Sequence, residues 1–319
     1  MPDLDKGDTE STVMSVVLDH EAYSSEYEPI SQTYLNNIDM YFQIMFYNFN
    51  SKKLIAAIPF DIEINTFSKN KYSDQQILDM IEKFYKDGLQ KADGTGTVNA
   101  FSQMESILNN FILREKYRFR IGVTDVVIEK RAIDSMPDKI KNNLNSLKNI
   151  YAQAFSSRLS LHQSVALVPH IEGEAIGGKM KQRFVNSDEI YDITLPRPDF
   201  SIHITIRGYK KQLVKTSDVT NIYLYGSYVN LKIIQPDIKK KYIDNKFKKG
   251  LQVKIPTSID SIDDWRKFYF STVKLFDEFA INVSNPNNKW LNLQKTKDQS
   301  SAQVKDSLKK VAKVLNKVR

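Results

Sequence analysis

The chain has 319 residues, of which 41% are hydrophobic and 26% charged, and its formal net charge is +8 at pH 7. This composition is typical of a globular protein with a packed core and excludes a chain that is disordered throughout. The sequence contains no cysteine, which excludes disulfide bonds, thiolate metal sites and a cysteine nucleophile.

The N-terminal part of the chain predicts an acidic arm followed by a β-hairpin. Residues 1–30 contain eight Asp or Glu and a single Lys, with one short apolar patch at 13–18, so we expect an extended arm. The stretches 37–49 and 54–64 are rich in aromatic and β-branched residues, and turn-forming residues lie between them. This pattern predicts two paired strands.

Three helices and one strand are predicted in the next part of the chain. A capping-box pattern at Ser73–Gln76 begins the first helix, and apolar residues between Phe101 and Phe111 lie on one face of the second. Tyr117–Ile128 has the composition of a strand. Pro137 then begins the third helix, since proline is tolerated in the first turn. We expect residues 31–160 to form a mixed hairpin-plus-helices domain.

Residues 161–260 predict a mainly antiparallel β region. Between Phe200 and Arg207 apolar and polar residues alternate, which is typical of a strand with one buried and one solvated face. Stretches 164–171 and 190–195 are also strand-like. We expect 221–233 to form a second hairpin that turns at Gly226 and Ser227.

C-terminal helices are predicted over residues 261–319. Ser261 to Asp264 form a capping pattern before an aromatic-rich helix, which we expect to be buried. The last twenty residues contain an apolar seam at spacings of four and three, and we interpret it as an assembly helix that docks on its own or a neighbouring subunit. The seam residues are Val304, Leu308, Val311, Leu315 and Val318. The order of all these elements predicts an α+β fold.

No motif in the sequence identifies a catalytic centre, a cofactor site or a metal site. The stretch Gly173–Lys179 has the glycine and lysine positions of a P-loop, but Met180 replaces the hydroxyl residue that binds magnesium. Asp199, Asp244 and Lys246 are residue types that metal-dependent nucleases use, but Asp244 lies in a lysine-rich stretch. The four histidines lack the spacing of a zinc helix. We therefore predict a protein without catalytic activity or cofactors.

A lysine-rich segment, 239–249, is predicted to be a protruding contact loop. Its lysines would neutralise phosphates and its aromatic side chains would stack on bases, while the lack of arginine favours contact without base specificity. The candidate contact residues, for nucleic acid or a protein partner, are Lys239, Lys240, Lys241, Tyr242, Lys246, Phe247, Lys248 and Lys249.

The distribution of charge favours a role in assembly. Residues 231–319 hold 20 Lys or Arg against 9 Asp or Glu, opposite in sign to the N-terminal arm. Contact between these regions would join copies of the chain, or other subunits, in a salt-sensitive way. We expect a non-enzymatic structural subunit, such as a bacteriophage virion or tail component. The alternative is a nucleic-acid-binding protein. No apolar run is long enough to cross a bilayer and no signal peptide is evident, so we expect cytoplasmic synthesis.

Overall fold

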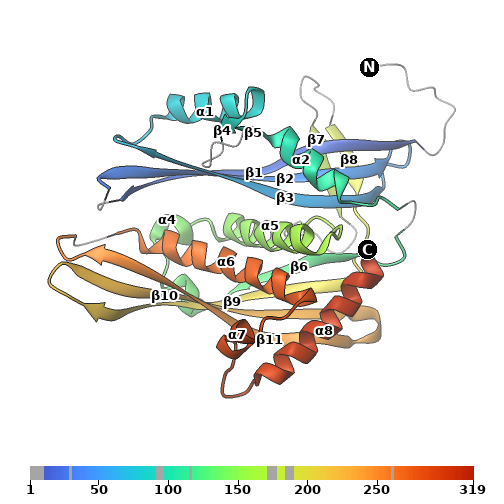
Figure 1. Cartoon of the computed structure of the whole chain (residues 1–319). Helices are drawn as coiled ribbons and strands as arrows, with labels where there is room; N and C mark the ends of the chain where they lie inside the picture. The colour runs from blue at the N-terminus through green and yellow to red at the C-terminus, as the bar shows by residue number, and fades with distance from the viewer. Residues whose placement is uncertain are drawn as a thin grey trace.

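A computed structural model describes residues 11–28, 31–90, 97–114, 117–170, 178–183, 190–259 and 262–319. It contains helices together with mainly antiparallel sheets, which confirms the α+β prediction. Two helices cover the first sheet, a layer of helices follows, and a second sheet lies on the other side of that layer (Figure 1).

The first sheet is antiparallel, with the strands β1 (Thr12–Glu28), β2 (Thr33–Asn48) and β3 (Leu54–Ser68) in that order. The β2–β3 hairpin confirms the prediction. The predicted arm, in contrast, pairs with β2 from Thr12 to Glu28 and is therefore the edge strand of the sheet. Residues 1–10 and 29–30 lie outside the described residues.

One face of the first sheet is covered by α1 (Asp74–Lys86) and α2 (Ala100–Asn109). The apolar side chains of β2 and β3 on this face, including Phe42 and Phe60, pack with Ile77 and Phe84 of α1. Ser73 caps α1 through the predicted capping box, in which its Oγ accepts from the Gln76 amide. A short ribbon of β4 (Leu89–Gln90) and β5 (Thr97–Val98) connects the two helices.

The second sheet has the order β11-β10-β9-β6, in which β6 is parallel to β9 and the other pairs are antiparallel. Its strands are β6 (Ile121–Ile128), β9 (Phe200–Thr216), β10 (Thr220–Gln235) and β11 (Lys240–Pro256). The predicted alternation in β9 is confirmed, because Ile202, Ile204 and Ile206 are fully buried. β6 belongs to the predicted 31–160 region but pairs with a strand of the 161–260 region.

The predicted turn at Gly226 and Ser227 is wrong, because β10 continues through both residues. The chain turns instead between Ser217 and Thr220, where the Ser217 amide donates to the Thr220 carbonyl. Gly226 leaves room within the strand for the ring of Tyr228, and the Ser227 hydroxyl donates to the Phe268 carbonyl on the helical side. These tertiary contacts explain why a glycine and a serine, which resemble a turn in the sequence, occur within a strand.

The middle layer consists mainly of α5 and α6, which lie between the two sheets (Figure 1). The third predicted helix is divided, because α4 ends before Asn142 and α5 begins after Asn143. Asp263 caps α6, while Ser261 lies outside the described residues. Within the described ranges, no helix combines the length and apolarity that crossing a bilayer requires. The helices after β6 are α3 (Lys130–Ile133), α4 (Asp138–Lys141), α5 (Leu144–Gln163), α6 (Asp264–Ser284), α7 (Asn288–Leu293) and α8 (Ser301–Val318).

A short segment at 165–168 joins the two sheets along one side of the helical layer. The Leu167 amide donates to the Ala57 carbonyl of β3, and the Val168 amide donates to the Ile121 carbonyl of β6. This segment replaces the strand predicted at 164–171, of which residue 171 lies outside the described residues. A ribbon of β7 (Lys179–Arg183) and β8 (Ile190–Thr194) lies nearby. The outermost strands are β1 and β3 in the first sheet and β11 and β6 in the second, and of these β3 and β6 each contact the 165–168 segment.

Candidate functional site

The lysine-rich segment is a strand, not the predicted protruding loop. Lys239 follows the short helix η1 (Pro236–Ile238) with φ of 52°, and β11 begins at the next residue. Tyr242 and Phe247 are five residues apart, and regular alternation would send them to opposite faces, but a β-bulge at Tyr242 lets both rings point into the core. Tyr242 is 9% exposed, and Phe247 is 1% exposed and stacks on Trp290. Neither ring is therefore available to stack on a base.

Many of the lysines in this segment are occupied by partners in the same chain. Lys241 pairs with Asp244 at 2.7 Å, Lys249 pairs with Glu278, and the Lys248 ammonium donates to the Lys295 carbonyl. Lys246 lies 3.6 Å from Asp298, and Lys240 lies over the Tyr242 ring. Lys246, Lys248 and Lys249 thereby join β11 to α6 and to the α7–α8 connection, whereas the contacts of Lys240 and Lys241 lie within β11.

The apolar seam of the C-terminal helix is buried in its own chain. Val304, Leu308, Val311 and Leu315 are fully buried and Val318 is 2% exposed. They pack in the same core as α5, α6 and the inner face of the second sheet. Of the two predicted docking modes, docking on the same subunit is therefore the one present, and these five side chains offer no surface to a neighbour.

β11 and α8 meet at an open groove of about 500 Å³. Lys241 and Lys310 line this groove, but so do the three carboxylates Asp244, Asp298 and Asp306. The two basic segments of the sequence thus come together at a place where acidic residues balance their charge. An open groove of balanced charge is a poor match for a phosphate backbone.

The outer edge of β11 is closed by glutamine side chains from the α7–α8 connection. The Lys246 amide donates to Gln299 Oε1 at 2.9 Å, and Gln299 Nε2 donates back to the Lys246 carbonyl at 2.8 Å. The Lys248 amide donates to Gln294 Oε1 at 2.9 Å. Gln299 thereby imitates the backbone of a further strand and blocks pairing with another chain over this part of β11.

The outer edge of β1 differs, because no such side chain caps its backbone in the described part of the chain. Its first seven residues, Thr12–Leu18, carry no charge. Met14, Val16 and Leu18 lie at alternate positions and are 47%, 40% and 44% exposed. An uncharged edge strand with exposed apolar side chains is a template for strand pairing. Sequence reasoning noted the apolar patch at 13–18 but did not identify it as a sheet edge.

The second half of β1 is acidic and is held by the protein itself. Glu26 accepts from Lys267 of α6 at 2.8 Å, and Arg266 lies 3.9 Å away. The Asp19 carboxylate accepts from Gln43 at 2.7 Å and from Gln153 of α5. These carboxylates of the predicted arm therefore contact the same chain's helices and first sheet.

Buried carboxylates also lie between the first sheet and the helices. Asp61 pairs with Arg158 of α5 at 2.7 Å, and burial raises the pKa of its carboxyl. Burial raises the pKa of Asp39 to about 6, although a hydrogen bond from Asn37 opposes this rise. Perturbed carboxyl groups are candidates for acid–base catalysis. Here their polar partners are side chains of the fold, so we interpret them as a structural polar layer.

The other groups considered for catalysis are separated in the fold. Asp199 accepts from the Arg120 amide at 2.7 Å, whereas Asp244 accepts from Lys241 and Asn230 on β11 and β10. In the described part of the chain, no three His, Asp or Glu side chains gather closely enough to hold a metal ion. Of the P-loop-like stretch, Gly173–Gly177 lies outside the described residues and Lys179 begins β7.

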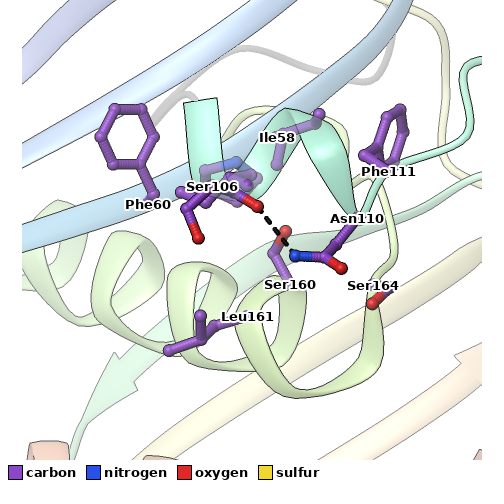
Figure 2. Close-up of a pocket in the computed structure, with 10 residues that line it drawn as sticks. Ile58, Phe60, Ser106, Asn110, Phe111, Ser160, Leu161 and Ser164 are labelled. Carbon is purple, nitrogen blue, oxygen red and sulfur yellow. Dashed lines mark hydrogen bonds between the residues drawn. The ribbon is translucent and has the colours of Figure 1, made fainter. Parts of the chain in front are cut away.

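A small pocket lies beside the edge strand β3, between α2 and α5 (Figure 2). It is lined by apolar side chains such as Phe60 and Leu161 together with Ser106, Asn110 and Ser160, and Asn110 Nδ2 donates to the Ser106 carbonyl. Its volume is about 110 Å³, whereas sites for organic ligands typically measure roughly 300–1,000 Å³. The pocket is too small for such a ligand.

Comparison with known proteins identifies no relative of this chain. No family model matches the sequence, and no curated protein matches it. The strand edges, the charges and the cavities of this chain are therefore the features that bear on its function.

Proposed function

We propose that this protein is a non-enzymatic structural subunit that assembles with a second copy of itself through the edge of β1. The observation that carries the proposal is the uncharged segment Thr12–Leu18, with three exposed apolar side chains on an uncapped edge. Proteins that stay monomeric block their sheet edges with charges, bulges or covering elements. β11 is covered in this way by Gln294 and Gln299, and none of the residues that the structure describes covers Thr12–Leu18 in the same way.

Charge specifies how two copies would pair. An antiparallel arrangement centred on Ser15 places Thr12–Leu18 of one copy along the same segment of the other, with Met14 opposite Val16. Registers that overlap the second half of β1 instead bring Asp19 and Glu21 near the acidic residues of the other copy, and like charges on facing strands are destabilising. The favoured register gives a closed two-fold dimer.

This contact differs physically from the charge-driven contact that the sequence predicts. Backbone hydrogen bonds and apolar burial would hold the β1 edges together, and the acidic second halves would extend away from one another. Because no ion pair would hold this contact, the dimer should persist at high ionic strength. A contact between an acidic arm and a basic surface would instead weaken.

The mass in solution tests the proposal. We expect size exclusion with light scattering to give twice the chain mass of 36.9 kDa at low and high salt. Val16→Lys places a charge in the centre of the contact and should give a monomer. Val127→Lys is the matched control, because Val127 is 43% exposed on β6 and lies away from β1. A wild-type monomer under all conditions, or dissociation by Val127→Lys as well, would refute the β1 contact.

Nucleic-acid binding is the second candidate, and one observation favours it. Lys309, Lys313 and Lys317 repeat every four residues on the exposed side of α8, with Lys310 beside them. A stripe of this kind can contact phosphates without reading bases. Binding of a labelled DNA oligonucleotide should then fall steeply as salt rises and should be lost in Lys309→Gln/Lys313→Gln. The virion or tail assignment stays a prediction.

A further inference from the structure

An open pocket of about 650 Å³ lies beside the β2–β3 turn, at the end of the molecule where β1 begins. Its volume is within the range of roughly 300–1,000 Å³ that is typical of small-molecule sites. Lys53, Arg114 and Arg120 line it, together with apolar side chains that include Leu54, Ile55 and Leu113. The pocket is separate from the Thr12–Leu18 edge contact, apart from Thr12, which lines both.

The charge of the lining has a single sign. Among the described residues that line the pocket there are three cationic side chains and no carboxylate. None of Lys53, Arg114 and the Arg120 guanidinium forms an ion pair within the described part of the chain. This distinguishes the pocket from the β11–α8 groove, where three aspartates accompany the lysines. Cations without counter-charges among the described lining residues, beside apolar side chains, favour an anionic ligand.

Arg120 is held in place beside the pocket. Its Nε is buried and has no hydrogen-bond partner in the described part of the chain. Its backbone amide is anchored by Asp199, so the residue is held in place at the start of β6. A second cavity of about 20 Å³ also borders Arg120, Leu54, Ile55 and Tyr117. Burial of Nε encloses the inner part of the side chain, which helps to hold the guanidinium at the wall of the pocket.

We propose that this pocket binds a small organic phosphate. Its phosphate group would lie against Arg114, Arg120 and Lys53, and its apolar body would contact Leu54, Ile55 and Leu113. Arginine matches phosphate oxygens with paired donors, and three cations fit the charge of a phosphate better than that of a single carboxylate. The inference does not depend on assembly through β1.

Calorimetric titration of the full chain tests this assignment with phenyl phosphate, benzoate, inorganic phosphate and phenol as probes. We expect phenyl phosphate to bind more tightly than each of the other three, because only it supplies both the phosphate and the apolar body. Arg120→Gln should weaken phenyl phosphate binding by about ten- to hundredfold, as expected for the loss of a charge-assisted hydrogen bond. Arg114→Gln alters an exposed side chain and gives a second variant that leaves the core intact.

Arg118→Gln is the matched control. It removes the same charge two residues from Arg120, but Arg118 is exposed, lies over the Phe119 ring and does not line the pocket. The Arg118→Gln variant should bind phenyl phosphate with the affinity of the wild type. Absence of phenyl phosphate binding at millimolar concentration would overturn the proposal. So would equal losses in Arg118→Gln and Arg120→Gln, or benzoate binding as tightly as phenyl phosphate.

Discussion

The two sheets pack against the same helices but use different chemistry to do so. The second sheet presents fully buried aliphatic side chains, including Ile204, Val229 and Leu231. The first sheet presents Asp39, Gln43 and Asp61 to the same helical layer, and these meet polar partners such as Arg158.

The edge strands β11 and β1 also differ from each other. The edge of β11 is capped by Gln294 and Gln299, whereas the edge of β1 over Thr12–Leu18 is uncharged and no side chain of the described residues caps it. The second sheet therefore has the features of a stable, closed scaffold, and the first those of a surface that accepts a partner. Four substitutions test this contrast.

The largest expected effect is in the second sheet. Phe247→Ala removes a fully buried ring that packs on Phe279 and Trp290, and such a change typically costs about 3–5 kcal/mol of unfolding free energy. Urea unfolding measures this loss. Val127→Ala, at an exposed position of β6, should stay within about 0.5 kcal/mol of the wild type. Equal effects of the two changes would contradict the packing of β11.

In the first sheet, the effect of replacing Asp39 on the free energy of unfolding should depend on pH. The folded-state pKa of Asp39 is about 6, above its ordinary value of 3.8. A raised pKa means that the folded state holds the proton more tightly than the unfolded state. The contribution of Asp39 to the free energy of unfolding is therefore favourable at low pH and is lost as pH rises through about 6.

Asp39→Asn removes that dependence. It should stabilise the protein by at most about 3 kcal/mol above pH 7 and have little effect near pH 4. Urea unfolding across this pH range measures the change, with the exposed Asp306→Asn as control. Destabilisation by Asp39→Asn at all pH values would show that the ionised carboxylate contributes favourably to the polar layer.

A smaller effect is expected at the closed edge. Gln299→Ala leaves the Lys246 amide and carbonyl without their partner and should cost about 1–3 kcal/mol. It also exposes a strand edge, so self-association should increase in light scattering. Gln252→Ala, on an exposed side chain of the same strand, is the control. An unchanged mass and stability would show that Gln299 is not what closes β11.

The smallest effect on stability is expected at the open edge. Val16→Lys alters a side chain that is 40% exposed, so the folded monomer should change by only about 0.5 kcal/mol. Its effect should be on the mass in solution and on the dependence of unfolding on protein concentration, which a dimer shows and a monomer does not. A large loss of monomer stability would indicate that Val16 belongs to the core.

Local patterns in the sequence determined much of the fold. Alternation in β9 identified its buried face, and the capping box at Ser73 located the start of α1. The seam from Val304 to Val318 predicted the side of α8 that is buried. These features depend on neighbouring residues along the chain, since the periods of helix and strand fix which side chains share a face.

Tertiary structure alone decided which surfaces remain open. Lysines and aromatic residues in 239–249 resemble a binding loop, but pairing with β10 turns Tyr242 and Phe247 into the core. Gln299 closes the edge of β11 from more than fifty residues away, and Arg120 meets Lys53 at one pocket although they are distant in sequence. Hydrogen bonds between strands and contacts between layers join residues far apart in the chain, and no local period encodes them.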